Sequence, residues 1–104
     1  MTLITLLAQN GTAGTIGAPS LFATGENRIG LQFNPQSTVG FSGTLIVEGS
    51  NAGQPGANDW VELASVVFSA HTQNFAIDMF TDTPWMRVRI AAGTSGAVSV
   101  YASV

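Results

Sequence analysis

The chain has 104 residues, a formal net charge of −3 at pH 7, no cysteine, and only 9% charged residues, where about 25% is usual for a soluble domain. One domain fits this length, and the lack of cysteine excludes disulfides and thiolate metal sites. Nucleic-acid and anionic-membrane binding are disfavoured, because the chain has three arginines and no lysine with which to neutralise phosphates.

Glycine and proline interrupt the sequence at short intervals, and β-branched and aromatic residues fill the segments between them. This pattern is typical of an all-β chain. We expect a single domain, residues 1–104, folded as an antiparallel double-sheet sandwich of about eight strands, jelly-roll-like or Ig-like, with little or no helix. The expected strands cover residues 2–9, 20–24, 27–33, 38–49, 59–69, 73–80, 85–92 and 96–103.

The first expected strand is apolar on both faces, with Leu3 and Leu7 on one face and Ile4 and Leu6 on the other. Two interpretations stay open: a central strand buried on both sides, or an extended N-terminal arm, residues 1–18, laid on a neighbouring subunit. Residues 10–18 are expected to form an irregular, flexible connection. The opening MTLITLLAQ has no basic n-region and no convincing cleavage site, so we expect no signal peptide.

Three later segments alternate between apolar and polar residues, which predicts strands with one core face. Ile46 interrupts the polar face of the segment 41–49 and is a candidate partner contact. Residues 50–59 are expected to form a long hairpin tip and residues 91–97 a shorter hairpin. The expected inward sets are Phe41, Leu45 and Val47; Phe75, Ile77 and Met79; and Val98, Val100 and Ala102.

Arg87 and Arg89 share one face of their strand with Trp85, while Met86, Val88 and Ile90 form the core face. Two like charges at this spacing repel, so each arginine is expected to have a carboxylate neighbour, with Glu48, Glu62 or Asp78 available. Three interpretations stay open: a cross-strand ion pair, a protein contact anchored by Trp85 and the arginines, or a sugar platform in which Trp60 or Trp85 stacks on a ring.

The terminal segments TLITLLAQ and AVSVYASV carry no charged side chain. Isolated sandwiches protect their edge strands with charge, above all with lysine, so we expect neighbouring chains to cover these two strands. Self-association, as a trimer or within a larger shell, is the prediction. The candidate interface residues are Leu3, Ile4, Leu6, Leu7, Ile46, Trp85, Arg87, Arg89 and Tyr101.

Catalytic and metal signatures are weak. His71 is the chain's one histidine, and no Gly-x-Ser-x-Gly motif accompanies it, so we interpret it as a polar turn residue. The six acids are scattered singly without a calcium-loop pattern, although Asp78 and Asp82 could approach one another across a turn. We therefore expect no enzyme activity, no catalytic residue, no metal and no cofactor.

The blocks GTLIVEGSNAGQPGANDWVELASVVF and TPWMRVRIAAGTSGAVSVYAS resemble small β-sandwich structural proteins of tailed-phage particles. In that group a Val-x-Gly-Ser-like turn leads through a Gly/Asn loop to a Trp strand, followed by a Pro-aromatic-x-Arg-Val strand and a Gly-rich hairpin. The resemblance spans residues 41–104. It is carried by Gly49, Ser50, Trp60, Leu63, Pro84, Trp85, Arg87, Val88, Gly96 and Val98.

This resemblance implies a virion component made in the host cytoplasm, and specifically a capsid decoration or cement protein. Such proteins commonly form homotrimers that bind the major capsid protein where capsomers meet, and the arm of residues 1–18 would contact the capsid or a neighbouring copy. A tail or baseplate component and a carbohydrate-binding module remain alternatives, with a glycan as partner in the second case.

Overall fold

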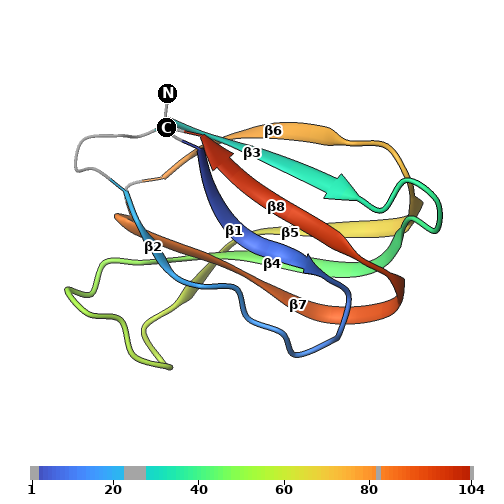
Figure 1. Ribbon diagram of the computed structural model, residues 1–104. Helices are drawn as coiled ribbons and strands as arrows, with labels where there is room; N and C mark the ends of the chain where they lie inside the picture. Colours follow the sequence, from blue (N-terminus) through green and yellow to red (C-terminus); the bar gives the residue numbers. More distant parts are fainter. Residues whose placement is uncertain (1–2, 23–27, 82, 104) are drawn as a thin grey trace.

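The computed structural model describes residues 3–22, 28–81 and 83–103. This part of the chain is all-β, without helix, and forms two antiparallel sheets packed as a sandwich (Figure 1). The expected sandwich of about eight strands is confirmed. Its strands are β1 (Leu3–Asn10), β2 (Ser20–Leu21), β3 (Arg28–Pro35), β4 (Phe41–Ser50), β5 (Val61–His71), β6 (Phe75–Phe80), β7 (Trp85–Gly96) and β8 (Val98–Ser103).

The strand order is β1-β8-β3-β6 in one sheet, called sheet A here, and β2-β7-β4-β5 in the other, sheet B. The pairs β1–β8, β2–β7, β3–β6 and β4–β5 are nested, as they would be in one long hairpin closed at the β4–β5 turn. Wrapping such a hairpin so that β8 meets β3 and β7 meets β4 produces the jelly-roll order. A single-residue bridge at Ile16 adds a fifth pairing segment to sheet B.

The two expected hairpins have different outcomes. Residues 51–60 connect β4 to β5 within sheet B, as predicted. The prediction of a shorter hairpin over residues 91–97 is wrong, because β7 continues to Gly96 in sheet B while β8 lies in sheet A. The chain crosses between the sheets at this point, and Gly96 allows the crossing with a φ of 76°, a conformation that glycine adopts without steric cost.

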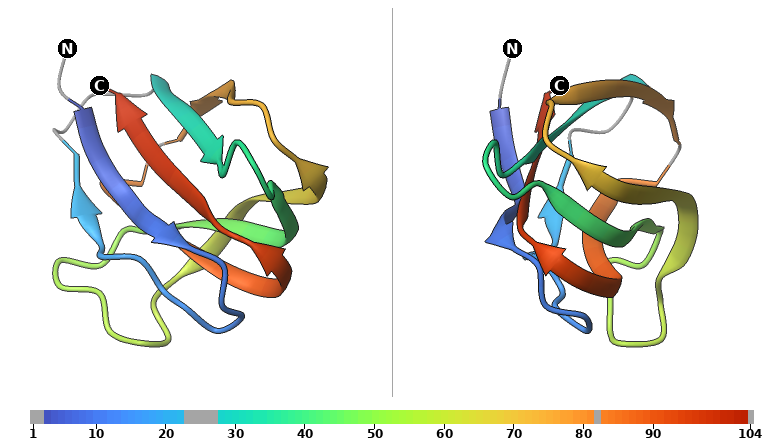
Figure 2. Two further views of the ribbon diagram at one scale, coloured as in Figure 1. Left: turned by 45° about the vertical axis from the view of Figure 1, so that its right-hand side comes forward. Right: turned by 90° about the vertical axis from the view of Figure 1, so that its right-hand side faces the viewer.

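The core lies between the two sheets and follows the predicted alternation. The inward sets of β4, β7 and β8 are buried, and the inward set of β6 packs against them partly exposed. Rings of Phe33, Phe68 and Phe75 pack together at one end of the core, with centroids 5.1–6.0 Å apart. The sandwich measures 38 × 29 × 17 Å, and Figure 2 shows its two layers from two further directions.

The two terminal strands differ from the expectation that both form exposed edges. β8 lies inside sheet A, hydrogen-bonded to β1 on one side and β3 on the other, so its lack of charge needs no partner chain. β1 is an edge strand, with a bulge between Thr5 and Leu7. A bulge places two consecutive residues opposite one partner, and this explains how the neighbouring Leu6 and Leu7 are both buried in the same core.

The connection after β1 is irregular, as predicted, apart from the single bridge at Ile16, and it is hydrogen-bonded along strand β7. Gly14 and Gly17 donate backbone hydrogen bonds to the carbonyls of Ile90 and Val88, and Ile90 donates to Thr15, each at 2.8 Å. Gly17 also lies directly against β1, where an added Cβ would stand 1.9 Å from the Leu6 carbonyl oxygen. Residues 3–18 therefore close one side of their own sandwich instead of extending away from it.

Candidate functional site

The outer face of sheet B carries three charged side chains in contact. Register places Glu48 on β4 beside Arg87 on β7, and Arg89 lies two residues further along β7. Glu48 Oε1 accepts a hydrogen bond from Arg87 Nε at 2.8 Å, and its Oε2 accepts one from Arg89 Nε at 3.0 Å. The prediction of a carboxylate neighbour for each arginine is confirmed, and a single carboxylate, Glu48, serves both.

Burial divides the three charges into an inner pair and an outer member. The exposed side-chain fractions are 8% for Glu48, 13% for Arg87 and 33% for Arg89. The Trp60 ring covers Arg87, with the guanidinium carbon 4.4 Å from the ring centroid, a cation–π arrangement. These four residues, the Glu48 cluster, brace β4 against β7 and leave one net positive charge facing water at Arg89.

Two further predicted interface residues lie on this same face. Ile46 stands between Arg89 on β7 and Ser65 on β5, and Trp85 stands between Ser50 and β2. Ile46 is almost completely buried although it faces outward, so it offers little apolar surface to a partner. The topology thus brings Ile46, Trp85, Arg87 and Arg89 together.

The other predicted interface residues lie elsewhere. Leu6 and Leu7 belong to the core, and Ile4 packs against it, so these side chains do not form a contact surface. The side chain of Leu3 lies outside the described part of the structure. Tyr101 is half-buried on the outer face of sheet A, remote in the fold from the Glu48 cluster.

The exposed edge of sheet B is a feature that the sequence did not indicate. Strand β5 is eleven residues long, ends the order of sheet B, and pairs on one side with β4. Val61 and Val67 are 64% and 71% exposed on it. Glu62 is its one acidic residue, and it has neither lysine nor arginine. A long, charge-poor edge of this kind is a template for pairing with another chain.

A hollow of about 310 Å³ opens on the outer face of sheet A. Its floor includes Gly30 on β3 and Ala76 on β6. Because Gly30 pairs with Ser103 on one side and Asp78 on the other, the small floor residue stands between two polar ones. We call this site the Tyr101 hollow; its walls are formed by Gln32, Asp78, Tyr101 and Ser103.

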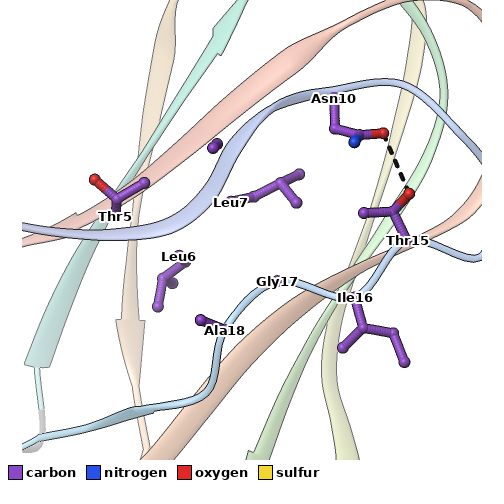
Figure 3. A pocket seen from close by; sticks show the side chains of 9 residues that line it. Thr5, Leu6, Leu7, Asn10, Thr15, Ile16, Gly17 and Ala18 are labelled. Carbon is purple, nitrogen blue, oxygen red and sulfur yellow. Dashed lines mark hydrogen bonds between the residues drawn. The ribbon is translucent and has the colours of Figure 1, made fainter.

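A second hollow, of about 350 Å³, lies at the seam between β1 and the segment that follows it (Figure 3). Leu6, Leu7 and Ile16 line it, and Asn10 Oδ1 accepts a hydrogen bond from Thr15 Oγ1 at 3.2 Å at one end. No charged side chain lines this seam, and its polar side chains are Thr5, Asn10 and Thr15, of which Asn10 and Thr15 are hydrogen-bonded to one another.

His71 and the acidic residues were the sequence's candidates for catalysis and metal binding. His71 is exposed at the end of β5, where its Nδ1 accepts a hydrogen bond from the Ser69 amide at 3.0 Å. Residues 3–22, 28–81 and 83–103 contain no group of three or more histidines, cysteines or acids placed to hold a metal ion. Asp78 pairs with Arg28, and its proposed neighbour Asp82 lies outside the described residues.

No helix in the described part of the chain is long and apolar enough to cross a membrane. No protein-family model, curated protein or solved structure matches this chain. The resemblance to phage structural proteins therefore stays a prediction, based on the residues quoted for it.

Proposed function

We propose that this chain is a non-enzymatic virion structural protein, a capsid decoration protein that assembles as a homotrimer and binds the major capsid protein of a tailed phage. The observation that supports self-assembly most directly is the β5 edge, which is long, poor in charge and exposes Val61 and Val67. The choice of a virion as its place of action rests on the resemblance of residues 41–104 to phage β-sandwich proteins.

The mechanism would be non-covalent cross-linking of neighbouring capsomers. A decoration subunit that contacts two capsomers adds contacts that must break before the capsomers separate, which strengthens a shell under internal pressure. The chain suits such contacts because its surface is rich in hydroxyls and amides and has few charges. Contacts of this kind depend weakly on ionic strength, since few charges are present to be screened.

Sedimentation velocity tests the assembly step. The wild-type chain should sediment as an oligomer at low micromolar concentration, with little change between low and moderate salt. Val67→Lys places a charge on the β5 edge and should shift the chain to monomer. Val39→Lys is the matched control, because Val39 is exposed in a turn outside the strands, and this variant should remain oligomeric. A wild-type monomer at every concentration would contradict the proposal.

Binding to particles tests the virion step. The chain should bind expanded, empty phage heads saturably and raise the temperature at which they break. Saturable binding to isolated tails with none to heads would instead favour a tail or baseplate component. The Val67→Lys variant should bind heads more weakly than wild type, because a monomer contributes one contact where an oligomer contributes several.

A further inference from the structure

The Tyr101 hollow has a floor that glycine keeps open. Gly30 lies inside β3 and is not among the described glycines with positive φ, so the backbone does not require glycine there. A Cβ at this position would stand 2.8 Å from Ser103 Oγ and 3.9 Å from Asp78 Oδ1, within the hollow. Glycine inside a strand weakens it and often marks a place where a ligand approaches the backbone.

The walls combine one aromatic ring with hydrogen-bonding groups of three kinds. Tyr101 on β8 faces Gln32 on β3, and one row along the sheet Ser103 and Asp78 flank Gly30. Among the described residues, the hydroxyls of Tyr101 and Ser103 have no side-chain hydrogen-bond partner. Gln32 Nε2 donates to Asn34 Oδ1 at 2.9 Å, which leaves the Gln32 side-chain carbonyl oxygen to accept a hydrogen bond. An aromatic face beside an amide, a carboxylate and a hydroxyl matches a ligand with an apolar face and a polar rim.

The charges at the hollow select the ligand further. Asp78 is the one acid among the lining residues, and it is paired with Arg28 outside them. The site therefore has no uncompensated charge with which to attract an ion. Its volume lies at the lower end of the range typical of small-molecule sites, roughly 300–1,000 Å³, which suits one ring better than a long chain.

We propose that the Tyr101 hollow binds a neutral saccharide, with one pyranose ring seated over Gly30 and Ala76 and its C–H face against Tyr101. Gln32, Asp78 and Ser103 hydrogen-bond the hydroxyl rim. The site is shallow and open, so a single ring should bind weakly, with a dissociation constant on the order of 1 mM. This site differs from the sugar platform predicted from the sequence, which would use Trp60 or Trp85; the Arg87 guanidinium lies over the Trp60 ring.

Amide NMR titration of the full chain tests the proposal. The probes are the methyl glycosides of glucose, galactose, mannose and N-acetylglucosamine, each raised to ~50 mM, well above the expected dissociation constant. At least one should cause saturable shifts of the Gly30 and Ala76 amides and of the Gln32 side-chain amide. Absence of saturable shifts with all four probes, or saturable shifts confined to the Glu48 cluster, would overturn it.

Variants separate recognition from folding. Tyr101→Ala should raise the dissociation constant by about tenfold or more. Tyr101→Phe keeps the ring, so its dissociation constant should stay within about threefold of the wild-type value. Should Tyr101→Ala fail to fold, Tyr101→Leu replaces it, because it keeps apolar bulk without an aromatic face. Unchanged affinity in the folded non-aromatic variant would overturn the assignment.

The ion pair supplies a second comparison. Asp78→Asn should weaken saccharide binding, because it removes a charged acceptor from the rim, whereas Arg28→Gln alters the same ion pair from outside the hollow and should leave binding unchanged.

Glucuronate should bind more weakly than the methyl glucoside. Tighter binding of glucuronate would overturn the inference that the site takes a neutral ligand.

Discussion

Replacing Glu48 by alanine should cost about 3 kcal/mol of unfolding free energy. The carboxylate accepts two charge-assisted hydrogen bonds, at 2.8 and 3.0 Å, and bonds of this kind contribute about 1.5–3 kcal/mol each when buried. The Arg87 bond is nearly buried and is assigned about 2 kcal/mol. The Arg89 side chain is 33% exposed, so its bond is assigned about 1 kcal/mol, as for pairs that water screens.

The loss is measurable by two routes. A 3 kcal/mol change lowers Tm by about 12–24 °C in a domain of this size, which circular dichroism would follow, and urea unfolding monitored by tryptophan fluorescence gives the free energy. Glu62→Ala is the matched control, since Glu62 pairs with Glu48 in register but is exposed, and it should change stability by less than about 0.5 kcal/mol.

A double-mutant cycle distinguishes the two arginines. Coupling between Glu48 and Arg87 should exceed coupling between Glu48 and Arg89, because the first pair is the more buried. If Glu48→Ala cost less than about 1 kcal/mol, or no more than Glu62→Ala, the Glu48 cluster would not brace the sheet and the reasoning would be refuted.

Three further substitutions test the fold. Gly96→Ala should cost about 3 kcal/mol or prevent folding, because φ is 76° and the new Cβ would stand 1.8 Å from a backbone carbonyl oxygen; Gly53→Ala, which meets nothing within 4 Å, should be nearly neutral in the same urea titration. Phe33→Ala should cost about 3–5 kcal/mol by thermal unfolding, against about 0.5 kcal/mol or less for the exposed Phe80→Ala. Trp60→Leu should lower the free energy of unfolding in urea by about 0.5–1 kcal/mol through loss of the cation–π contact with Arg87. The same Trp60 substitution should have no such effect in a chain whose Arg87 has already been replaced.

The fold class could be predicted from the sequence because strand alternation is a local property. Phe41, Leu45 and Val47 lie an even number of residues apart on one strand and are all buried, since neighbouring side chains on a strand point to opposite faces. Strand order depends on contacts between residues far apart in the sequence, which no local pattern records. The last strand, β8, shows the consequence. A strand without charged residues can be an exposed edge that another chain covers, or it can lie inside its own sheet. β8 lies inside sheet A, between β1 and β3.

The candidate site could be predicted only in part, for the same reason. Like-charge repulsion between Arg87 and Arg89 predicted a carboxylate, but three acids were equally available until the β4–β7 register placed Glu48 beside them. The Tyr101 hollow draws on β3, β6 and β8, and its opening depends on Gly30, a glycine without a turn signal around it. Strand pairing alone places that glycine between Asp78 and Ser103.

The two proposed surfaces should act independently, because they belong to different sheets. Pairing at the β5 edge extends sheet B in its own plane, and the Tyr101 hollow opens on the outer face of sheet A. The Val67→Lys variant, which we expect to be monomeric, should therefore bind a methyl glycoside in solution with the wild-type dissociation constant. On a surface densely coated with the same sugar, it should bind at least tenfold more weakly than the wild-type chain, because the proposed oligomer would engage several sites at once. Loss of solution binding together with oligomerisation would show that the hollow is completed by a second copy, and would contradict this division between the sheets.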